Sequence, residues 1–222
     1  MSGSKAEIHP FDLQKRAALA ARSLTLLLDE RREGLMYFLA SWRAKPPRAF
    51  HILWDYGDGS GRHIDALTLV RRMLPAGWPE ADPDRGEAQI ESWMLRQLGH
   101  AGLSWLPEEP WTVPPWGADL LLRDWLPGEA AAEISWGQRG TLLGLTSRFQ
   151  ATQDELYAAA GRRMIEGLLR VAERDGQDLY FPEGYYRRGG WRTRDRRIFS
   201  GIAEYNAALL VAAVRFHRAC GY

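Results

Sequence analysis

Apolar residues recur at three- and four-residue spacing along most of this chain, with polar residues between them. This period places the apolar side chains on one face of an α-helix. Six segments carry the pattern and are expected to form helices: residues 10–29, 64–74, 87–102, 136–149, 152–172 and 200–216. The pattern is clearest in 152–172, where Thr152 and Glu155 also fit a capping box. The spacing therefore predicts an all-α protein.

Long segments rich in aromatic residues and proline separate several of these helices, notably 103–133 and 175–199. Loops of this length argue either for a function or against these element boundaries. The order of segments is helix, aromatic loop, helix, repeated three times. The predicted hairpin units cover about residues 10–77, 85–149 and 152–219.

A weak internal repeat supports this division. Three aromatic strings follow the first helix of each unit: GLMYFLASW at 34–42, GLSWLPEEPW at 102–111 and DLYFPEGYY at 178–186. Repetition at a fixed period indicates stacked units, each of which needs its neighbours to bury its apolar face. Chance similarity of short aromatic strings is the alternative. We expect three consecutive helical hairpins with the long aromatic loops at one end.

The stretch WDYGDGSGRH, residues 54–63, has a composition unsuited to a core. It combines two carboxylates, three glycines, two aromatic residues and two potential cations. Glycine lets a backbone approach a ligand closely, and a helix is expected to begin near Ile64, with its N–H groups facing the stretch. We therefore predict a ligand-binding loop here. The alternative is a structural role, in which Asp55 and Asp58 form turns and cap the helix, with Arg62 paired to one of them.

Two other readings of this stretch are weaker. Asp55, Asp58 and Ser60 resemble a calcium loop only faintly, because the alternating ligand positions and the closing glutamate are missing. A phosphate loop would require a Gly-Lys-Ser/Thr sequence after the glycines, and none follows. We expect neither a metal nor a cofactor.

Charge and cysteine content narrow the functional classes. The 29 Lys and Arg residues nearly balance 28 Asp and Glu residues, which argues against nucleic acid or an anionic membrane as a partner. The single cysteine, Cys220, cannot form an internal disulfide. Charged residues interrupt the N-terminal segment, and no apolar run reaches membrane-spanning length. We expect a cytoplasmic protein.

Tryptophan is unusually frequent, with ten residues in the chain of 222. Most of them stand beside glycine, proline or a charge in the predicted loops: Trp54, Trp105, Trp111, Trp116, Trp136 and Trp191. Indole faces beside carboxylates and arginines suit sugar rings, which stack on the aromatic face and hydrogen-bond through their hydroxyls. The alternative is that these side chains only pack the loops onto the helices.

Three strings carry a resemblance to a known superfamily: WDYGDGSGRHIDAL, ISWGQRGTLLGL and FSGIAEYNAALL. Each leads into the second helix of a predicted hairpin. In this respect the chain resembles the six-hairpin, or (α/α)6-toroid, glycosidases. The resemblance implies that these second helices belong to an inner ring and that the loops before them build a sugar-binding cleft. It therefore implies that the chain forms part of an (α/α) toroid.

The resemblance also raises a question of completeness, because six hairpins close such a toroid and this chain supplies about three. An open half-ring exposes an apolar surface that a stable monomer rarely tolerates. The chain is then a fragment of a longer enzyme, a protein that needs an oligomeric partner, or a smaller helical module. We expect the first, with the C-terminal half of the catalytic domain missing.

Glycoside hydrolysis needs one carboxylic acid and a second carboxylate that acts as base or nucleophile. Asp58 is the first candidate for the base or nucleophile, because a helix N-terminus favours the ionised form, and Asp55 is its substitute. Glu183, in the aromatic run FPEGYY, is the first candidate for the acid, because partial burial raises a carboxyl pKa. Glu204 is second choice and equally suits compensation of the helix dipole.

Other polar and aromatic residues are expected to bind the sugar. Arg62, His63, Gln138 and Arg139 are the predicted partners of hydroxyls or of a uronic-acid carboxylate, since arginine binds carboxylates through two hydrogen bonds. Trp54, Trp136, Tyr186 and Trp191 are the predicted stacking platforms. His63 suits a structural hydrogen bond equally well.

The sequence thus predicts a glycoside hydrolase that acts on an oligosaccharide, with uronic acid as a candidate component. Two alternatives use the same residues. One is a non-catalytic helical module that binds sugar or protein. The other is a polysaccharide lyase or epimerase, since those reactions rely on Tyr, His and Arg to neutralise a uronate and abstract a proton.

Overall fold

The computed structural model describes residues 12–51, 56–82, 85–106, 131–134, 136–182, 184–187, 189–193 and 200–222. Side chains at positions 100, 184, 185, 192, 193, 200–202 and 205 are outside this description. Trp54, Asp55 and Glu183 also lie outside the described residues. The predictions made for these three side chains therefore stay predictions.

The described helices are α1 (Leu13–Thr25), α2 (Asp58–Arg71), α3 (Arg85–Arg96), α5 (Trp136–Thr152), α6 (Glu155–Val171) and α7 (Ser200–Cys220). All six lie within or overlap the segments expected to be helical. Several boundaries differ from the expectation: α2 begins at Asp58 instead of near Ile64, and α3 ends at Arg96 instead of near Gly102. The first helix ends at Thr25 instead of near Asp29, because Leu28–Asp29 form strand β1. The predicted capping box at Thr152 is wrong, since the side chain of Asp154 caps α6 through the N–H of Leu156, at 2.9 Å.

The prediction of an all-α fold is wrong, because short antiparallel strands pair between the helices. In the described residues β1 (Leu28–Asp29) pairs with β2 (Leu35–Met36), and β3 (Leu39–Ser41) pairs with β4 (Arg48–Phe50). Next to α6, β6 (Glu173–Asp175) pairs with β7 (Asp178–Tyr180). The fourth sheet has the order β5-β8-β9 and joins Ala131–Glu133 to Gly184–Arg187 and Gly190–Thr193.

The physical reason for this error is strand length. The strands contain two to four residues, too few for a period of two to be recognised. Segments expected to be aromatic loops, such as 34–42 and 178–186, instead supply residues to β2, β3, β7 and β8. The chain is therefore a mixed α and β structure, and an all-helical toroid does not describe it.

Helix α5 lies at the centre of the protein and is buried on several sides. Its Leu145 belongs to a core cluster with Ile64 of α2 and Met94 of α3. Its Leu142 belongs to a second cluster with Met164 of α6. Burial on both sides makes α5 the element against which the other helices are positioned.

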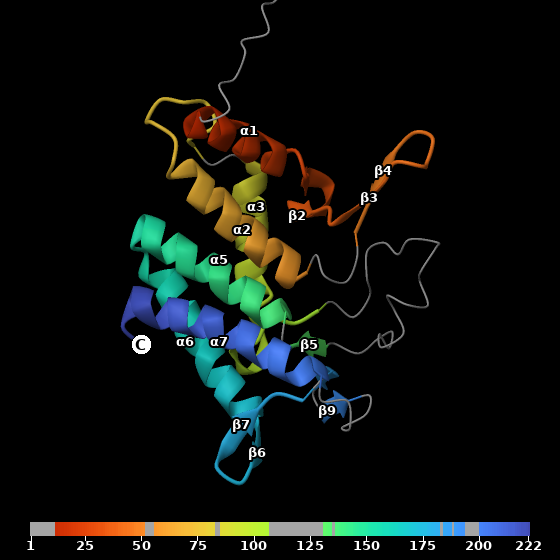
Figure 1. The fold of residues 1–222 in the computed structure, drawn as a ribbon, viewed down its shortest axis with the longest axis vertical. Coiled ribbons are helices and arrows are strands. Elements are labelled where there is room, and N and C mark those ends of the chain that lie inside the picture. Colours follow the sequence, from red (N-terminus) through yellow and green to blue (C-terminus); the bar gives the residue numbers. More distant parts are fainter. Residues whose placement is uncertain are drawn as a thin grey trace, which may run out of the picture.

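Helices α2, α5 and α7 run in the same direction. The first turns of α2 and α5 meet at Gly57 and Gly137. Further along, the guanidinium group of Arg215 in α7 donates to both carboxylate oxygens of Asp65, at 3.1 and 2.8 Å, and to Ser147 Oγ at 2.6 Å. Figure 1 shows that all three helices begin at the end of the molecule where β2–β5 and β9 lie. The starts of these helices therefore share one face.

A polar cluster fastens the β3–β4 hairpin at its base. Tyr37 precedes β3 and donates its hydroxyl to Asp29 Oδ2 at 2.7 Å, while His51 follows β4 and places Nε2 3.1 Å from the same oxygen. The two rings stack with centroids 4.4 Å apart. Burial acts to raise the pKa of Asp29, but hydrogen bonds from Tyr37, His51 and the N–H of Arg31 outweigh it, so the pKa is lowered.

The same cluster predicts a dependence of stability on alkaline pH. Burial and the hydrogen bond to Asp29 raise the pKa of Tyr37 from 10.0 to about 12. A raised pKa stabilises the folded chain fully below 10.0, and this contribution is lost as pH rises toward about 12. The free energy of unfolding, measured with urea, should therefore fall more steeply above pH 10.0 for the wild type than for Tyr37→Phe. Equal slopes would contradict the assignment.

Candidate functional site

The N-terminal turns of α2 and α5 touch through their backbones, because glycines stand at the contact. An added Cβ at Gly57 would lie 2.8 Å from the Cα of Gly137, and one at Gly61 would lie 2.1 Å from the carbonyl of Gly140. The sequence Asp58–His63 was expected to belong to a loop, but it forms the start of α2. Its glycines serve close helix packing here.

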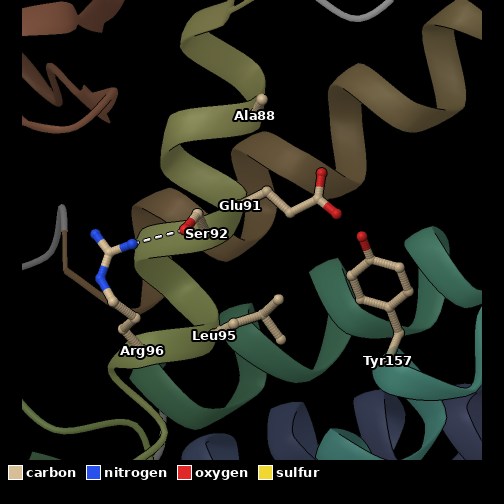
Figure 2. Close-up of a pocket in the computed structure, with 6 residues that line it drawn as sticks. All are labelled: Ala88, Glu91, Ser92, Leu95, Arg96 and Tyr157. Atoms are coloured by element: carbon tan, nitrogen blue, oxygen red, sulfur yellow. Dashed lines mark hydrogen bonds between the residues drawn. The ribbon is translucent and has the colours of Figure 1, made fainter.

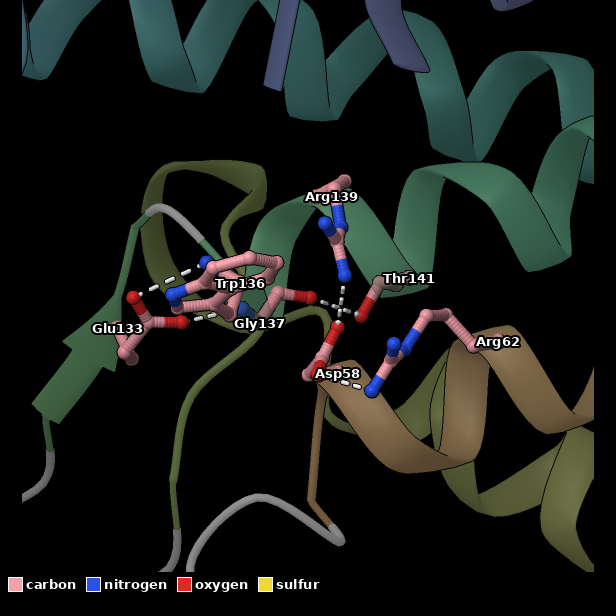
Figure 3. A network of polar contacts seen from close by, with 7 residues as sticks. All are labelled: Asp58, Arg62, Glu133, Trp136, Gly137, Arg139 and Thr141. Atoms are coloured by element: carbon pink, nitrogen blue, oxygen red, sulfur yellow. Dashed lines mark hydrogen bonds and ion pairs between the residues drawn. The ribbon is translucent and has the colours of Figure 1, made fainter. Parts of the chain in front are cut away.

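This contact brings together residues that are far apart in the sequence. Arg139 of α5 donates through Nη2 to Asp58 Oδ1 at 3.0 Å, across 81 positions, and Arg62 of α2 donates through Nη2 to Oδ2 at 2.6 Å. Figure 3 shows Asp58 between the two guanidinium groups. We call this group the α2–α5 cluster, and it consists of Asp58, Arg62, Glu133, Trp136 and Arg139.

Asp58 is only 6% exposed. Burial raises the pKa of its carboxyl group, and the charges and hydrogen bonds of Arg62 and Arg139 oppose this effect. Because both oxygens already accept hydrogen bonds, the carboxylate orients the two arginines. The expected pairing of Arg62 with an aspartate of residues 54–63 is therefore confirmed. Arg139 is a second partner of the same aspartate, Asp58.

The arginines differ in their access to solvent. The side chain of Arg62 is 43% exposed, whereas that of Arg139 is 14% exposed and its guanidinium carbon lies 4.0 Å from the centre of the Trp136 ring. Two guanidinium groups share one carboxylate, which leaves one positive charge unbalanced by Asp58. Arg62 is therefore the cation of the cluster with the greater access to a ligand.

Glu133, which the sequence reasoning missed, caps α5. Its Oε1 accepts the N–H of Trp136 at 3.0 Å, and its Oε2 accepts the N–H of Gly137 (Figure 3). A carboxylate at this place offsets the positive end of the helix dipole. In the sequence, the only indication of this cap was a glutamate three residues before the start of the helix. The sheet β5-β8-β9 is needed to hold Glu133 in that place.

Gln138 and His63, both predicted to bind the sugar, are buried, at 0% and 4% exposure. The amide of Gln138 accepts the N–H of Ser104 at 2.8 Å and donates to the carbonyl of Ser104 at 2.8 Å. It also donates to the carbonyl of Glu133 at 2.9 Å. Gln138 thus fixes the segment at Ser104 against the start of α5.

The remaining described candidates lie outside the α2–α5 cluster. Trp191 donates its indole N–H to the carbonyl of Val171 at 2.8 Å, and its ring meets Tyr186 edge-on with centroids 5.6 Å apart. Both pack against the core cluster that contains Leu142. Glu204 is exposed on α7. Of the residues predicted for the site, the structure brings together Asp58, Arg62, Trp136 and Arg139.

A separate hollow of about 480 Å³ lies between α3 and α6. It is lined by Ala88, Glu91, Ser92, Leu95, Arg96 and Tyr157, shown in Figure 2. Burial raises the pKa of Glu91, against the opposing charge of Arg148, whose Nε lies 3.1 Å from its Oε2. The side chain of Arg96 is engaged with Ser92 and Glu33. The hollow shares no residue with the α2–α5 cluster.

Among the described residues, no group of three or more His, Cys, Asp or Glu side chains is arranged to hold a metal ion. None of the helices in the described part of the chain has the length and apolar content required to cross a membrane. Comparison of the chain with protein-family models, curated proteins and solved structures finds no match.

Proposed function

We propose that the chain acts on an oligosaccharide that contains uronic acid, and that the α2–α5 cluster binds the acidic sugar. One observation carries the proposal: Asp58 holds two arginines at the adjacent starts of two helices, with the ring of Trp136 beside Arg139. Helix N-termini favour anions, and arginine binds a carboxylate through two hydrogen bonds. The likeness of three strings to glycosidase sequences points to the same substrate class and stays a prediction.

The proposed reaction is hydrolysis of a glycosidic bond by paired carboxylates. Asp58 is the proposed base or nucleophile. Burial raises the pKa of its carboxyl group, and the two guanidinium groups oppose this effect by stabilising the carboxylate form. Glu183, outside the described residues, is the proposed acid. Arg62 has the exposed guanidinium group that would meet the uronate. Trp136 would offer the apolar ring face.

A second candidate is a non-catalytic module that binds the same sugar. It is favoured by the hydrogen bonding of Asp58, since both carboxylate oxygens are engaged by arginines. A nucleophile needs one oxygen free for the sugar carbon. In this alternative Asp58 only positions Arg62 and Arg139.

The test compares variants of the purified chain with acidic and neutral oligosaccharides, using calorimetry for binding and product analysis for cleavage. Asp58→Asn should lower turnover by about a hundredfold or more and change binding only a few-fold. Arg62→Gln should weaken binding of the acidic sugar by about tenfold and leave neutral sugars unaffected. Arg72→Gln, which removes an exposed arginine at the other end of α2, is the matched control.

Each outcome selects one reading. Binding that depends on Arg62 without any turnover supports the binding module. An unsaturated uronide among the products supports a lyase. If Arg62→Gln binds the acidic sugar as tightly as the wild type does, or if no acidic sugar binds, the α2–α5 cluster is rejected as the sugar site. Circular dichroism and thermal melts would check that Asp58→Asn is folded.

A further inference from the structure

The β3–β4 hairpin has a charge pattern that the proposed site does not use. No acidic residue occurs from Gly34 to Trp54, while Arg43, Lys45 and Arg48 all lie in or next to its turn. All three cations are exposed. No ion pair of these side chains with another described residue is present. The hairpin therefore presents positive charge to solvent.

An aromatic side chain stands beside these cations. Trp42 is 82% exposed, the largest exposed fraction of any large apolar side chain in the described residues. An exposed indole beside cations suits a ligand that has both a flat or apolar face and negative charge. Leaving this ring in water is unfavourable in the free chain, so a partner that covers it gains free energy from its burial.

The base of the hairpin is anchored to the body of the protein. Its two ends, Tyr37 and His51, are both fastened to Asp29 by the hydrogen bonds described above. Pro46 and Pro47 restrict the backbone of the turn. Figure 1 shows the hairpin projecting from the body of the protein, at the end where α2 and α5 begin. Anchoring at the base and the two prolines reduce the conformational entropy that the hairpin loses on binding.

We infer that the β3–β4 hairpin binds an anionic polysaccharide, a polyuronate, through Trp42 and the cations Arg43, Lys45 and Arg48. This inference rests on the proposed function for its choice of partner. The hairpin and the α2–α5 cluster lie at the same end of the protein, so a long acidic chain engages both. The hairpin thereby adds affinity for long substrates and none for short ones.

Two other anionic partners fit the observations less well. A lipid bilayer rewards several exposed apolar side chains, and Trp42 is the only large one exposed between Gly34 and His51. Nucleic acid carries a dense row of phosphates, whereas the whole chain has a formal net charge of +1. Both partners serve as competing outcomes in the experiment.

The experiment measures affinity for long oligogalacturonate and for the galacturonate dimer by calorimetry at fixed salt. The variant Arg43→Gln/Lys45→Gln/Arg48→Gln should bind the long ligand about tenfold more weakly, with affinity for the dimer unchanged. Trp42→Ala should have a similar effect. The matched control, Arg72→Gln/Arg163→Gln/Arg174→Gln, removes three exposed arginines elsewhere and should bind like the wild type.

Failure of this inference is distinguishable from failure of the proposed function. If the hairpin variants bind the long ligand as the wild type does, or the control variant is equally weakened, the hairpin is not a polyuronate site. Equal hairpin-dependent binding of phosphatidylserine–phosphatidylcholine vesicles or oligothymidylate also overturns it. A third outcome separates the two proposals. If Arg62→Gln does not change binding of the dimer but the hairpin variants still weaken binding of the long ligand, the α2–α5 cluster is rejected and the hairpin is supported.

Discussion

Replacing Gly61 with alanine should lower the free energy of unfolding by about 3 kcal/mol or more, because the new methyl group has no space. Its Cβ would lie 2.1 Å from both the carbonyl carbon and the carbonyl oxygen of Gly140. These are backbone atoms in the N-terminal part of α5, so no side chain can turn away. The two helices must separate, and separation opens the core cluster that contains Ile64 of α2 and Leu145 of α5.

The measurement is urea unfolding followed by circular dichroism, with Gly176→Ala as the control. Gly176 has a φ of +60°, and an added Cβ there meets nothing within 4 Å. Its substitution tests backbone strain alone and should lower stability by about 1 kcal/mol. A Gly61→Ala variant no less stable than Gly176→Ala would show that the close contact of α2 and α5 is wrong.

The same substitution bears on the α2–α5 cluster. Arg139 reaches Asp58 only because Gly57, Gly61 and Gly140 let the helices touch. The folded fraction of the Gly61→Ala variant should therefore bind acidic sugar more weakly than the wild type. Under the proposed function, this loss follows without a change in any residue of the cluster.

Replacing Arg71 with alanine is expected to destabilise the chain by about 3–5 kcal/mol, since it removes the cation of a buried ion pair. Arg71 Nε donates to Glu87 Oε2 at 2.7 Å, and the two side chains are 8% and 1% exposed. Arg71 Nη1 also donates to the carbonyls of Glu80 and Asp82, at 2.6 and 2.5 Å. One side chain thus ties the end of α2 to α3 and to the segment before it.

Two further variants separate charge from packing. Arg71→Met/Glu87→Leu removes both charges together and should be more stable than Arg71→Ala, because the buried carboxylate is removed along with the arginine. Arg96→Gln breaks the Arg96–Glu33 ion pair, in which each side chain is 53% exposed, and should change stability by less than about 1 kcal/mol. Thermal and urea unfolding give the comparison. Equal losses for Arg71→Ala and Arg96→Gln would refute the buried pair.

Much of the candidate site was predictable from local sequence. Asp58 and Arg62 are four residues apart, a spacing that places them on one face of α2, although residues 54–63 were expected to form a loop. Trp136 and Arg139 share a helical turn. Their meeting across the glycine contact was not predictable, because it depends on how two backbones pack. The glycines were evident in the sequence. However, glycine allows a backbone to approach either a ligand or another helix, so its presence does not distinguish the two.

The roles of other residues near the site could not be predicted from the sequence. Gln138 has the chemistry of a sugar-binding amide, yet its hydrogen-bonding groups are used by the backbone at Ser104 and Glu133. Glu133 had no periodic pattern to identify it, because its place is set by pairing with Tyr185 in the sheet β5-β8-β9. Side-chain chemistry indicates what a residue can bind, while burial decides whether a ligand can reach it.

By itself the sequence determined where the helices lie, because apolar side chains at helical spacing act within one segment of the chain. The tertiary structure alone decided which helix starts meet, which strands pair and which cations are left exposed. Those outcomes depend on contacts between residues far apart, such as Asp58 with Arg139 or Asp65 with Arg215. Such contacts form only when many weakly specified segments pack together, and no local pattern encodes them.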